Sequence, residues 1–405
     1  MIMDIPNNVV KPVICRLCFF DKARILNRTF VLFVALASFL ACSDDDQAPR
    51  REVLVQATPV LTRTASELQT FIGASSLDID PGLLQYDVEI FKVVYKTTYK
   101  SEEIAASGLV ILPRTTDAVG MVSFQHGTIA ARSEAPTALP ISSSSLILYA
   151  ALSSAGFIAV VPDFIGFGES SEVFHPYYVE ETTADAVIDN IRAAREWASE
   201  KKIRFNRKLF LAGYSQGGYA TMAAHKEIES NGLENFQLVA SFPASGGYDV
   251  KGMQEYFFAQ ETYDEPYYMA YVALSYQSYY NWDDQSLADF FNEPYASAIP
   301  SLFNGTNGAG TINAQLTDNI SELIKEDLLN NIETDPQYDY LVDAFIGNSL
   351  TDWKPTIPMF MYHGNADTTV PYQNSVETYD QLILNGASSS VVTLTTLEGA
   401  DHGTG

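Results

Sequence analysis

KLFLAGYSQG, residues 208–217, places Ser215 at the junction of two different patterns. The run 208–212 is short and apolar, which predicts a buried strand, and residues 217–230 have helical periodicity. A strand that turns sharply into a helix holds a serine in a strained conformation with its oxygen exposed, and the flanking glycines leave room for that turn. The N-terminus of the helix adds unpaired N–H groups and partial positive charge where an oxyanion would develop. This context predicts that Ser215 is a catalytic nucleophile, since Gly-x-Ser-x-Gly in a plain loop would carry little information.

The base for this serine is sought among the histidines. A serine hydroxyl is a poor nucleophile at neutral pH, and histidine has the pKa that suits proton removal. Five histidines are present. His402 follows the last apolar run, where a loop can carry it back over the carboxyl edge of the sheet, so we expect it to be the base. His225, on the helix after the serine, and His363, at the end of a strand, fit structural roles better. His126 ends an early strand and His175 lies in a loop.

The third group of such a site is a carboxylate that orients the imidazole and stabilises its charged form. Asp367 follows the apolar run 357–362 and precedes a helical pattern, which places it at the carboxyl end of a strand. Asp401 is adjacent to His402, and neighbouring residues seldom point their side chains at each other. Asp163 also ends a strand but precedes the nucleophile, and its surroundings suggest a loop-stabilising role. We therefore expect Asp367 to be the acid, with Asp163 as the more serious rival.

An oxyanion hole needs two preorganised N–H donors. The backbone N–H of Gln216, directly after the nucleophile, is expected to be one of them. The second should come from the loop after the early strand 121–125, where Gly127 lets the backbone approach the substrate. We expect Gly127 or Thr128 to be this donor and His126 to brace the loop.

Short apolar runs alternate with helical patterns along most of the chain. Each run ends at Gly, Pro, His or Asp, which is typical of buried parallel strands. Strands that alternate with helices call for right-handed crossovers and a mostly parallel sheet with both faces covered. The expected class is therefore α/β, with a central sheet flanked by helices and entered by a hairpin. The expected strands are 86–99, 105–112, 121–125, 157–161, 208–212, 238–242, 357–362 and 391–397, and the expected helices are 183–199, 217–230 and 375–385.

Between residues 248 and 346 the alternation lapses and aromatic residues accumulate. We interpret this segment as an inserted cap, which divides the core into an N-terminal part, 73–247, and a C-terminal part, 347–405. Residues 304–310 read NGTNGAG and predict a flexible loop, because glycine at this density favours neither helix nor strand.

Residues 1–41 have the parts of a lipoprotein signal peptide. A basic stretch precedes the apolar run 30–41, which is too short for a membrane anchor of about 20 residues. Cys42 follows, and FLAC resembles a bacterial lipobox, although Phe39 departs from the commonest pattern. We expect export, lipidation of Cys42, and anchoring to the outer membrane with possible exposure at the cell surface. Residues 42–72 are expected to form an acidic tether, and a plain signal peptide with an acidic linker is the alternative.

The composition limits the classes of function. Apolar residues make up 47% of the chain and charged residues 18%, which is typical of a folded globular protein. The formal net charge of −26 opposes binding to phosphate backbones and to anionic membrane surfaces. No nucleic-acid partner is expected, and solubility outside the cell is the simpler explanation of the charge.

Four motifs in this order resemble the α/β-hydrolase superfamily, and more narrowly its secretory lipase and esterase branch, over about residues 85–405. They are SFQHGT at 123–128, VPDFIGFG at 161–168, GYSQGG at 213–218 and HGNADTTVP at 363–371. The superfamily order of serine, acid and histidine supports Asp367 and His402. The resemblance implies hydrolysis through an acyl-enzyme on Ser215, without a metal or organic cofactor. Relatives usually continue with a helix after the histidine, whereas this sequence ends three residues after it, so we expect a truncated sequence or an unusually free histidine loop.

Three classes of function are compatible with these residues. The first is a serine carboxylic-ester hydrolase that acts on acyl lipids or on ester-decorated glycans, because tyrosine both lines apolar tunnels and stacks on sugar rings. The second is a serine peptidase of the prolyl or dipeptidyl type, which would need acidic residues such as Glu255, Glu261 or Glu265 to hold a peptide amine. The third is a binding protein on a retired hydrolase scaffold, against which the complete set of catalytic groups argues.

Overall fold

The computed structural model describes residues 52–75 and 79–404. These residues belong to one compact unit, Pro49–Gly405, and the other unit, Met1–Ala48, contains none of them. The predicted signal peptide, residues 1–41, and the predicted lipidation site, Cys42, lie outside the described residues.

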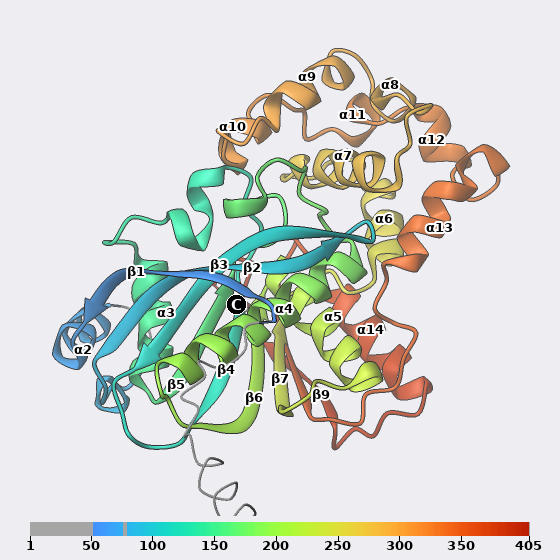
Figure 1. Cartoon of the computed structure of the whole chain (residues 1–405). Coiled ribbons are helices and arrows are strands. Elements are labelled where there is room, and N and C mark those ends of the chain that lie inside the picture. The colour runs from blue at the N-terminus through green and yellow to red at the C-terminus, as the bar shows by residue number, and fades with distance from the viewer. Residues whose placement is uncertain (1–51, 76–78, 405) are drawn as a thin grey trace, which may run out of the picture. The chain divides into compact units, whose positions relative to one another are not determined.

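A nine-stranded sheet forms the centre of the described part of the chain (Figure 1). Its strand order is β1-β2-β3-β5-β4-β6-β7-β8-β9. The first three strands and the β3–β5 pair are antiparallel, whereas β5, β4, β6, β7, β8 and β9 run parallel to one another. The eight expected strands are all present, and the predicted α/β class is confirmed. The strands are β1 Leu54–Arg63, β2 Val88–Tyr99, β3 Glu102–Pro113, β4 Val119–Gln125, β5 Phe157–Pro162, β6 Phe205–Tyr214, β7 Gln237–Ala244, β8 Met359–Gly364 and β9 Val392–Leu397.

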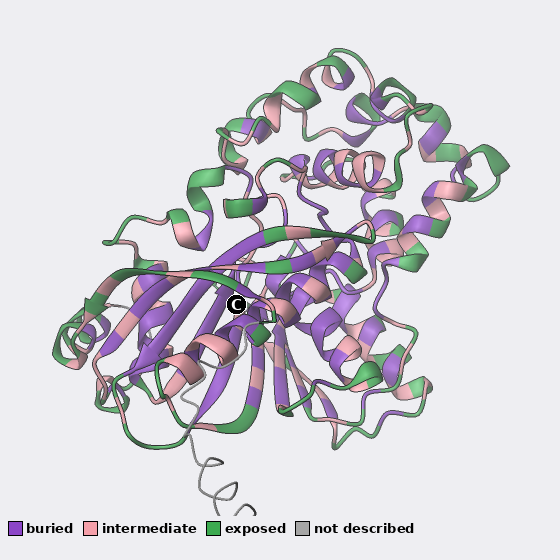
Figure 2. Ribbon diagram, in the orientation of Figure 1, coloured by how far each residue is buried: buried purple, intermediate pink, exposed green. Residues whose placement is uncertain are grey.

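Helices cover both faces of this sheet, and the alternation of side chains along β3 shows it. Leu109 and Ile111 pack in the hydrophobic cluster formed with α2 and α3, whereas Val110 and Leu112 pack in the cluster formed with α4 and α5. The strands β3, β4 and β5 are consequently buried along most of their length (Figure 2). These helices are α2 Ala65–Ala74, α3 Ser144–Ser154, α4 Glu180–Glu200 and α5 Gln216–Asn231, and α14 Tyr372–Leu384 contacts β8 and β9.

The prediction that residues 42–72 form a tether is wrong for residues 54–72. Ordered structure begins at β1, well before residue 73, where the core was expected to start. β1 pairs antiparallel with β2 as an edge strand. Backbone pairing stabilises it without a continuous buried face, since most of its side chains are exposed or half-buried, and this weakens the apolar pattern in the sequence. α2 begins at a capping box formed by Thr64 and Glu67. The spacing of those two residues is the signal that sequence reasoning overlooked.

The segment between β7 and β8 is helical, and it corresponds to the predicted cap, 248–346. Figure 1 shows its yellow and orange helices gathered beyond one edge of the sheet. They have a hydrophobic cluster of their own, which includes Phe257, Ile299 and Leu341. Its α-helices are α6 Val250–Phe258, α7 Tyr267–Tyr280, α8 Leu287–Phe290, α9 Tyr295–Leu302, α10 Ala309–Asn313, α11 Ile320–Leu323, α12 Glu326–Asn331 and α13 Asp339–Gly347. Across residues 52–75 and 79–404, no helix combines the length and apolarity that a membrane crossing requires.

Candidate active site

Ser215 occupies a sharp turn between β6 and α5. β6 ends at Tyr214 and α5 begins at Gln216, so Ser215 is the only residue between strand and helix, and its backbone has φ 59° and ψ −125°. A positive φ at a non-glycine residue costs of order 1–3 kcal/mol and persists only where the surroundings enforce it. The backbone around this turn is closely packed, because a Cβ added at Gly213 would lie 2.2 Å from the carbonyl oxygen of Gly217. The turn therefore depends on the small residues of its motif.

A chain of hydrogen bonds joins the three side chains predicted to form the site. The Ser215 hydroxyl donates to Nε2 of His402 at 2.9 Å, and Nδ1 of His402 donates to Oδ2 of Asp367 at 2.6 Å. An imidazole that donates from Nδ1 to a carboxylate leaves Nε2 free to accept the serine proton. The structure thus brings these residues together in the order in which proton transfer needs them.

Asp367 is buried among four donors. Its Oδ1 accepts the backbone N–H groups of Thr369 and Val370 at 2.9 and 3.0 Å, and its Oδ2 also accepts Nε2–H of His363 at 3.1 Å. Burial opposes ionisation, but the hydrogen bonds from His363 and His402 outweigh it and lower the pKa of Asp367 to about 2. The carboxylate is therefore charged at neutral pH.

The two rival acids have other partners. The carboxylate of Asp401 is exposed and accepts the backbone N–H of Gly403 and the hydroxyl of Thr404. Asp163 is fully buried and accepts the hydroxyls of Ser107 and Thr137 at 2.5 and 2.6 Å, which ties the end of β5 to β3 and to the segment 136–138. Asp367 is accordingly the carboxylate that contacts the histidine.

The loop that carries His402 is held by the residue before the serine. The Tyr214 hydroxyl donates to the backbone carbonyl of His402, and the two rings lie 5.2 Å apart. Sequence reasoning treated Tyr214 as a variable position of the motif. No local pattern could reveal this contact, because it joins residues 188 positions apart.

The residues predicted to supply the oxyanion donors are Gly127, Thr128 and Gln216. Gly127 lies beside the nucleophile, since a Cβ added there would be 3.6 Å from Cβ of Ser215. The hydroxyl of Thr128 shares a hydrogen bond with Tyr177 at 2.8 Å, which anchors the loop. As the first residue of α5, Gln216 has a backbone N–H without a partner inside the helix.

The side chain of Gln216 is fixed by His175, a contact that the sequence did not suggest. His175 Nδ1 donates to the carbonyl of Ile165 at 2.6 Å, which leaves Nε2 to accept the Gln216 amide at 2.7 Å. Burial lowers the pKa of His175 to about 4, so the ring is neutral at pH 7. His126 donates from Nδ1 to the carbonyl of Gly127, and burial also lowers its pKa.

The remaining predicted structural histidines are fully buried. His225 lies between Ser241 and Glu229, and His363 accepts the Ser375 hydroxyl at Nδ1. Within the described ranges, no group of three or more His, Cys, Asp or Glu side chains is arranged to hold a metal ion.

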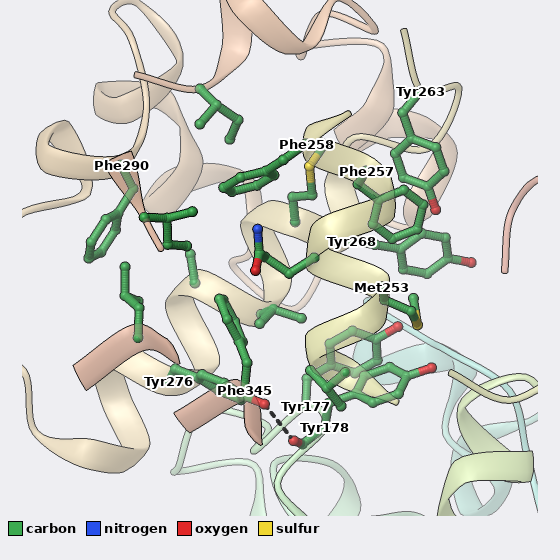
Figure 3. Close-up of a pocket in the computed structure, with 18 of the residues that line it drawn as sticks. Tyr177, Tyr178, Met253, Phe257, Phe258, Tyr263, Tyr268, Tyr276, Phe290 and Phe345 are labelled. Atoms are coloured by element: carbon green, nitrogen blue, oxygen red, sulfur yellow. Dashed lines mark hydrogen bonds between the residues drawn. The ribbon is translucent and has the colours of Figure 1, made fainter. Parts of the chain in front are cut away.

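A largely apolar cavity of about 110 Å³ opens onto Ser215 and extends among the helices of the segment between β7 and β8 (Figure 3). Most of its wall is aliphatic or aromatic, and Figure 3 shows the rings of Phe257, Phe258, Tyr268 and Phe345 around it. Its lining residues are Tyr177, Tyr178, Ser215, Val250, Met253, Gln254, Phe257, Phe258, Tyr263, Tyr268, Met269, Val272, Ala273, Tyr276, Trp282, Phe290, Phe291, Ile324, Leu328, Ile332, Leu341, Phe345, Thr369 and Val370. The cavity is suited to an apolar chain that starts at the serine.

Comparisons with known proteins agree with this fold. Residues 131–242, which include Ser215, match the model of the secretory lipase family. A proposed hydrolase from Legionella pneumophila is 27% identical over 87% of this chain and 94% of its own, with a TM-score of 0.78. The rice cell wall degrading esterase LipA from Xanthomonas oryzae, in a ligand-bound form, is 24% identical over 88% of this chain and 93% of its own, with a TM-score of 0.77. Lipase A from Candida antarctica is 15% identical over 86% of this chain and 77% of its own, with a TM-score of 0.61. No curated protein matches the chain significantly.

Proposed function

We propose that the chain, which has the α/β-hydrolase fold and matches the secretory lipase family over residues 131–242, hydrolyses carboxylic esters of apolar acyl chains through an acyl-enzyme on Ser215. The observation that carries this proposal is the hydrogen-bond chain Asp367–His402–Ser215, whose serine lines an apolar cavity. The family resemblance alone would not select the chemistry, since one fold hosts many functions.

The proposed reaction has two steps that share one histidine. In the first, Ser215 Oγ attacks the ester carbonyl carbon while its proton passes to Nε2 of His402. The tetrahedral intermediate collapses, and the leaving alcohol takes that proton. In the second step, water gives its proton to Nε2 and attacks the acyl-enzyme, and the proton returns to Ser215 as the acid leaves. Asp367 stays ionised throughout, because its pKa is about 2, and it stabilises the imidazolium.

The oxyanion is assigned to backbone N–H groups on both sides of the serine. Gln216 provides one from the N-terminus of α5, where the helix dipole adds partial positive charge. Gly127 or Thr128 provides the other. The anchors support this assignment: His175 holds the Gln216 side chain and Tyr177 holds Thr128, so the donors are in place before the charge develops.

The cavity favours an acyl lipid over the other substrates considered. Its wall offers few partners for the hydroxyls of a sugar, whose desolvation would then be costly. A peptidase would need a carboxylate to hold an amine, but among the described residues that line the cavity there is no Asp or Glu. Glu255 is paired with Lys251, and the side chain of Glu265 accepts a hydrogen bond from Asn313.

We also propose that the protein is exported and anchored through lipid on Cys42. The match to a family of secretory lipases supports export, and the sequence of residues 30–42 supports the lipid. Replacement of Cys42 by Ala should release the protein from the membrane fraction. A Cys42→Ala protein that stays membrane-bound with the wild-type mass would contradict the anchor.

The test of the function is a hydrolysis profile of nitrophenyl esters from acetyl to palmitoyl. We expect turnover that rises from acetyl towards longer chains, because each added methylene buried in the cavity contributes about 0.8 kcal/mol. Ser215→Ala should abolish turnover, whereas Ser230→Ala, an exposed serine on the same helix, should not. An acetyl optimum would contradict the acyl-lipid substrate, and turnover that survives Ser215→Ala would contradict the mechanism.

A further inference from the structure

One face of α6 forms a wall of the cavity. The residues of this helix that line it are Val250, Met253, Gln254, Phe257 and Phe258. Their spacing of three and four places them on one side of the helix. Four of the five are apolar, so Gln254 interrupts an otherwise continuous apolar stripe.

The amide of Gln254 is buried without a partner for its oxygen. The residue is 8% exposed, and its Oε1 makes no hydrogen bond. Several tyrosine hydroxyls of the same cavity do have partners: that of Tyr263 donates to the carbonyl of Thr369, and that of Tyr276 donates to the carbonyl of Tyr178. Buried polar atoms are nearly always paired, so the unpaired oxygen of Gln254 needs a physical explanation. Since Gln254 lines the substrate cavity, a donor on the substrate is the partner that would satisfy this oxygen.

Gln254 is separated along the chain from the part of the structure that lies beside the nucleophile. Ser215 N–H donates to the carbonyl of Ala244 at 2.9 Å, so the end of β7 lies beside the nucleophile, and α6 begins six residues later at Val250. Four residues of helix advance about 6 Å. Gln254 therefore lies about one turn of α6 beyond Val250, and both residues line the cavity.

We propose that Gln254 recognises a hydroxyl group part-way along the acyl chain, so that the preferred substrates are esters of hydroxylated fatty acids. This inference rests on the proposed ester hydrolysis. A hydroxyl is the neutral donor that an apolar wall tolerates once it is paired. An ammonium group would need a carboxylate that the lining does not offer, and a keto group could not donate to Oε1.

The experiment compares matched nitrophenyl esters of one long chain on the full protein. The acyl chain of the first ester carries no hydroxyl. The other three esters carry one hydroxyl each, next to the ester, at mid-chain or at the terminal carbon. We expect kcat/KM for the mid-chain isomer to exceed that for the unsubstituted ester about tenfold, the effect of one hydrogen bond to a buried group. Gln254→Leu should remove this preference and raise kcat/KM for the unsubstituted ester, because no unpaired amide then faces its chain.

Two outcomes would overturn the recognition of a hydroxyl: equal kcat/KM for all isomers, or a preference that Gln254→Leu leaves intact. Turnover of at least one of these esters separates the proposals, since the absence of turnover with all of them would contradict the ester hydrolase itself. If Gln254→Leu does not fold, thermal shifts of the wild-type protein with the free mid-chain hydroxy acid and its unsubstituted counterpart decide the question. A larger shift with the hydroxy acid supports the inference, and equal shifts overturn it.

Discussion

Replacement of Asp367 by Asn should reverse the direction of the hydrogen bond that prepares the histidine. Oδ1 of Asp367 is held by the N–H groups of Thr369 and Val370. These two donors will keep the amide oxygen of an Asn on their side and turn its NH2 towards His402 and His363. Because an NH2 group only donates, His402 must then accept with Nδ1 and carry its proton on Nε2. Such a ring cannot remove the proton of the serine.

The expected loss in kcat is about 10⁴-fold, the effect of the same substitution in a serine protease whose histidine is driven into the wrong tautomer. That factor corresponds to about 5.5 kcal/mol of transition-state stabilisation. KM should change little, because Asp367 does not line the cavity. The assay is kcat and KM on a nitrophenyl ester for Asp367→Asn. Asp401→Asn is the matched control, since this exposed carboxylate precedes His402 but pairs with Gly403 and Thr404, and it should retain activity within about threefold of wild type.

Two results would refute this reasoning. If Asp367→Asn kept more than about a tenth of wild-type kcat, the tautomer would not depend on that carboxylate. If both variants lost activity equally, the effect would belong to the negative charge near the loop and not to the hydrogen bond of Asp367.

Three further predictions concern stability. Burial lowers the pKa of His175 to about 4, whereas the unfolded chain titrates near 6.5, so stability present above about pH 6.5 is lost as the pH falls. In urea unfolding we expect the free energy of unfolding to fall by about 2 kcal/mol between about pH 7.5 and about pH 5, and to fall less in His175→Gln. Equal losses in the two proteins would contradict the assignment of this pH dependence to His175. Gly217→Ala should cost about 3 kcal/mol or more, or prevent folding, because the added Cβ would lie 1.9 Å from the carbonyl oxygen of Gln125. The Cβ added by Gly310→Ala meets nothing within 4 Å, so this control should leave Tm nearly unchanged. Equal losses of Tm in Gly217→Ala and Gly310→Ala would contradict the close packing at Gly217. Ser215→Gly relieves the positive φ and should be more stable than Ser215→Ala by about 1 kcal/mol in thermal denaturation, and a less stable Gly variant would refute strain at the turn.

The features that could be predicted from the sequence are those with a local signature. Ser215 was predicted from a strand, a turn and a helix that follow one another, and Asp367 from its place after a strand. His402 was predicted from the order of the groups along the chain. The structure brings these side chains into one hydrogen-bonded chain. Buried parallel strands are nearly continuous apolar runs, which is why the sheet could be predicted with the site.

The features that were not predicted depend on contacts between distant residues. His175 meets Gln216 across 41 positions of sequence, and Tyr214 meets the loop of His402 across 188. No periodicity or spacing encodes such pairs. The depth of the cavity and the unpaired amide of Gln254 also depend on how the helices between β7 and β8 pack, of which the sequence showed only an abundance of aromatic residues.

The most direct test of the account is covalent labelling of the folded protein with a fluorophosphonate, followed by mass spectrometry of the intact chain and of its peptides. A single adduct on the peptide that contains Ser215 is predicted, with much slower labelling in His402→Ala, because the serine then lacks its base. Folded protein that takes up no label, or an adduct on any other residue, would contradict a nucleophilic role for Ser215 and with it the proposed ester hydrolase.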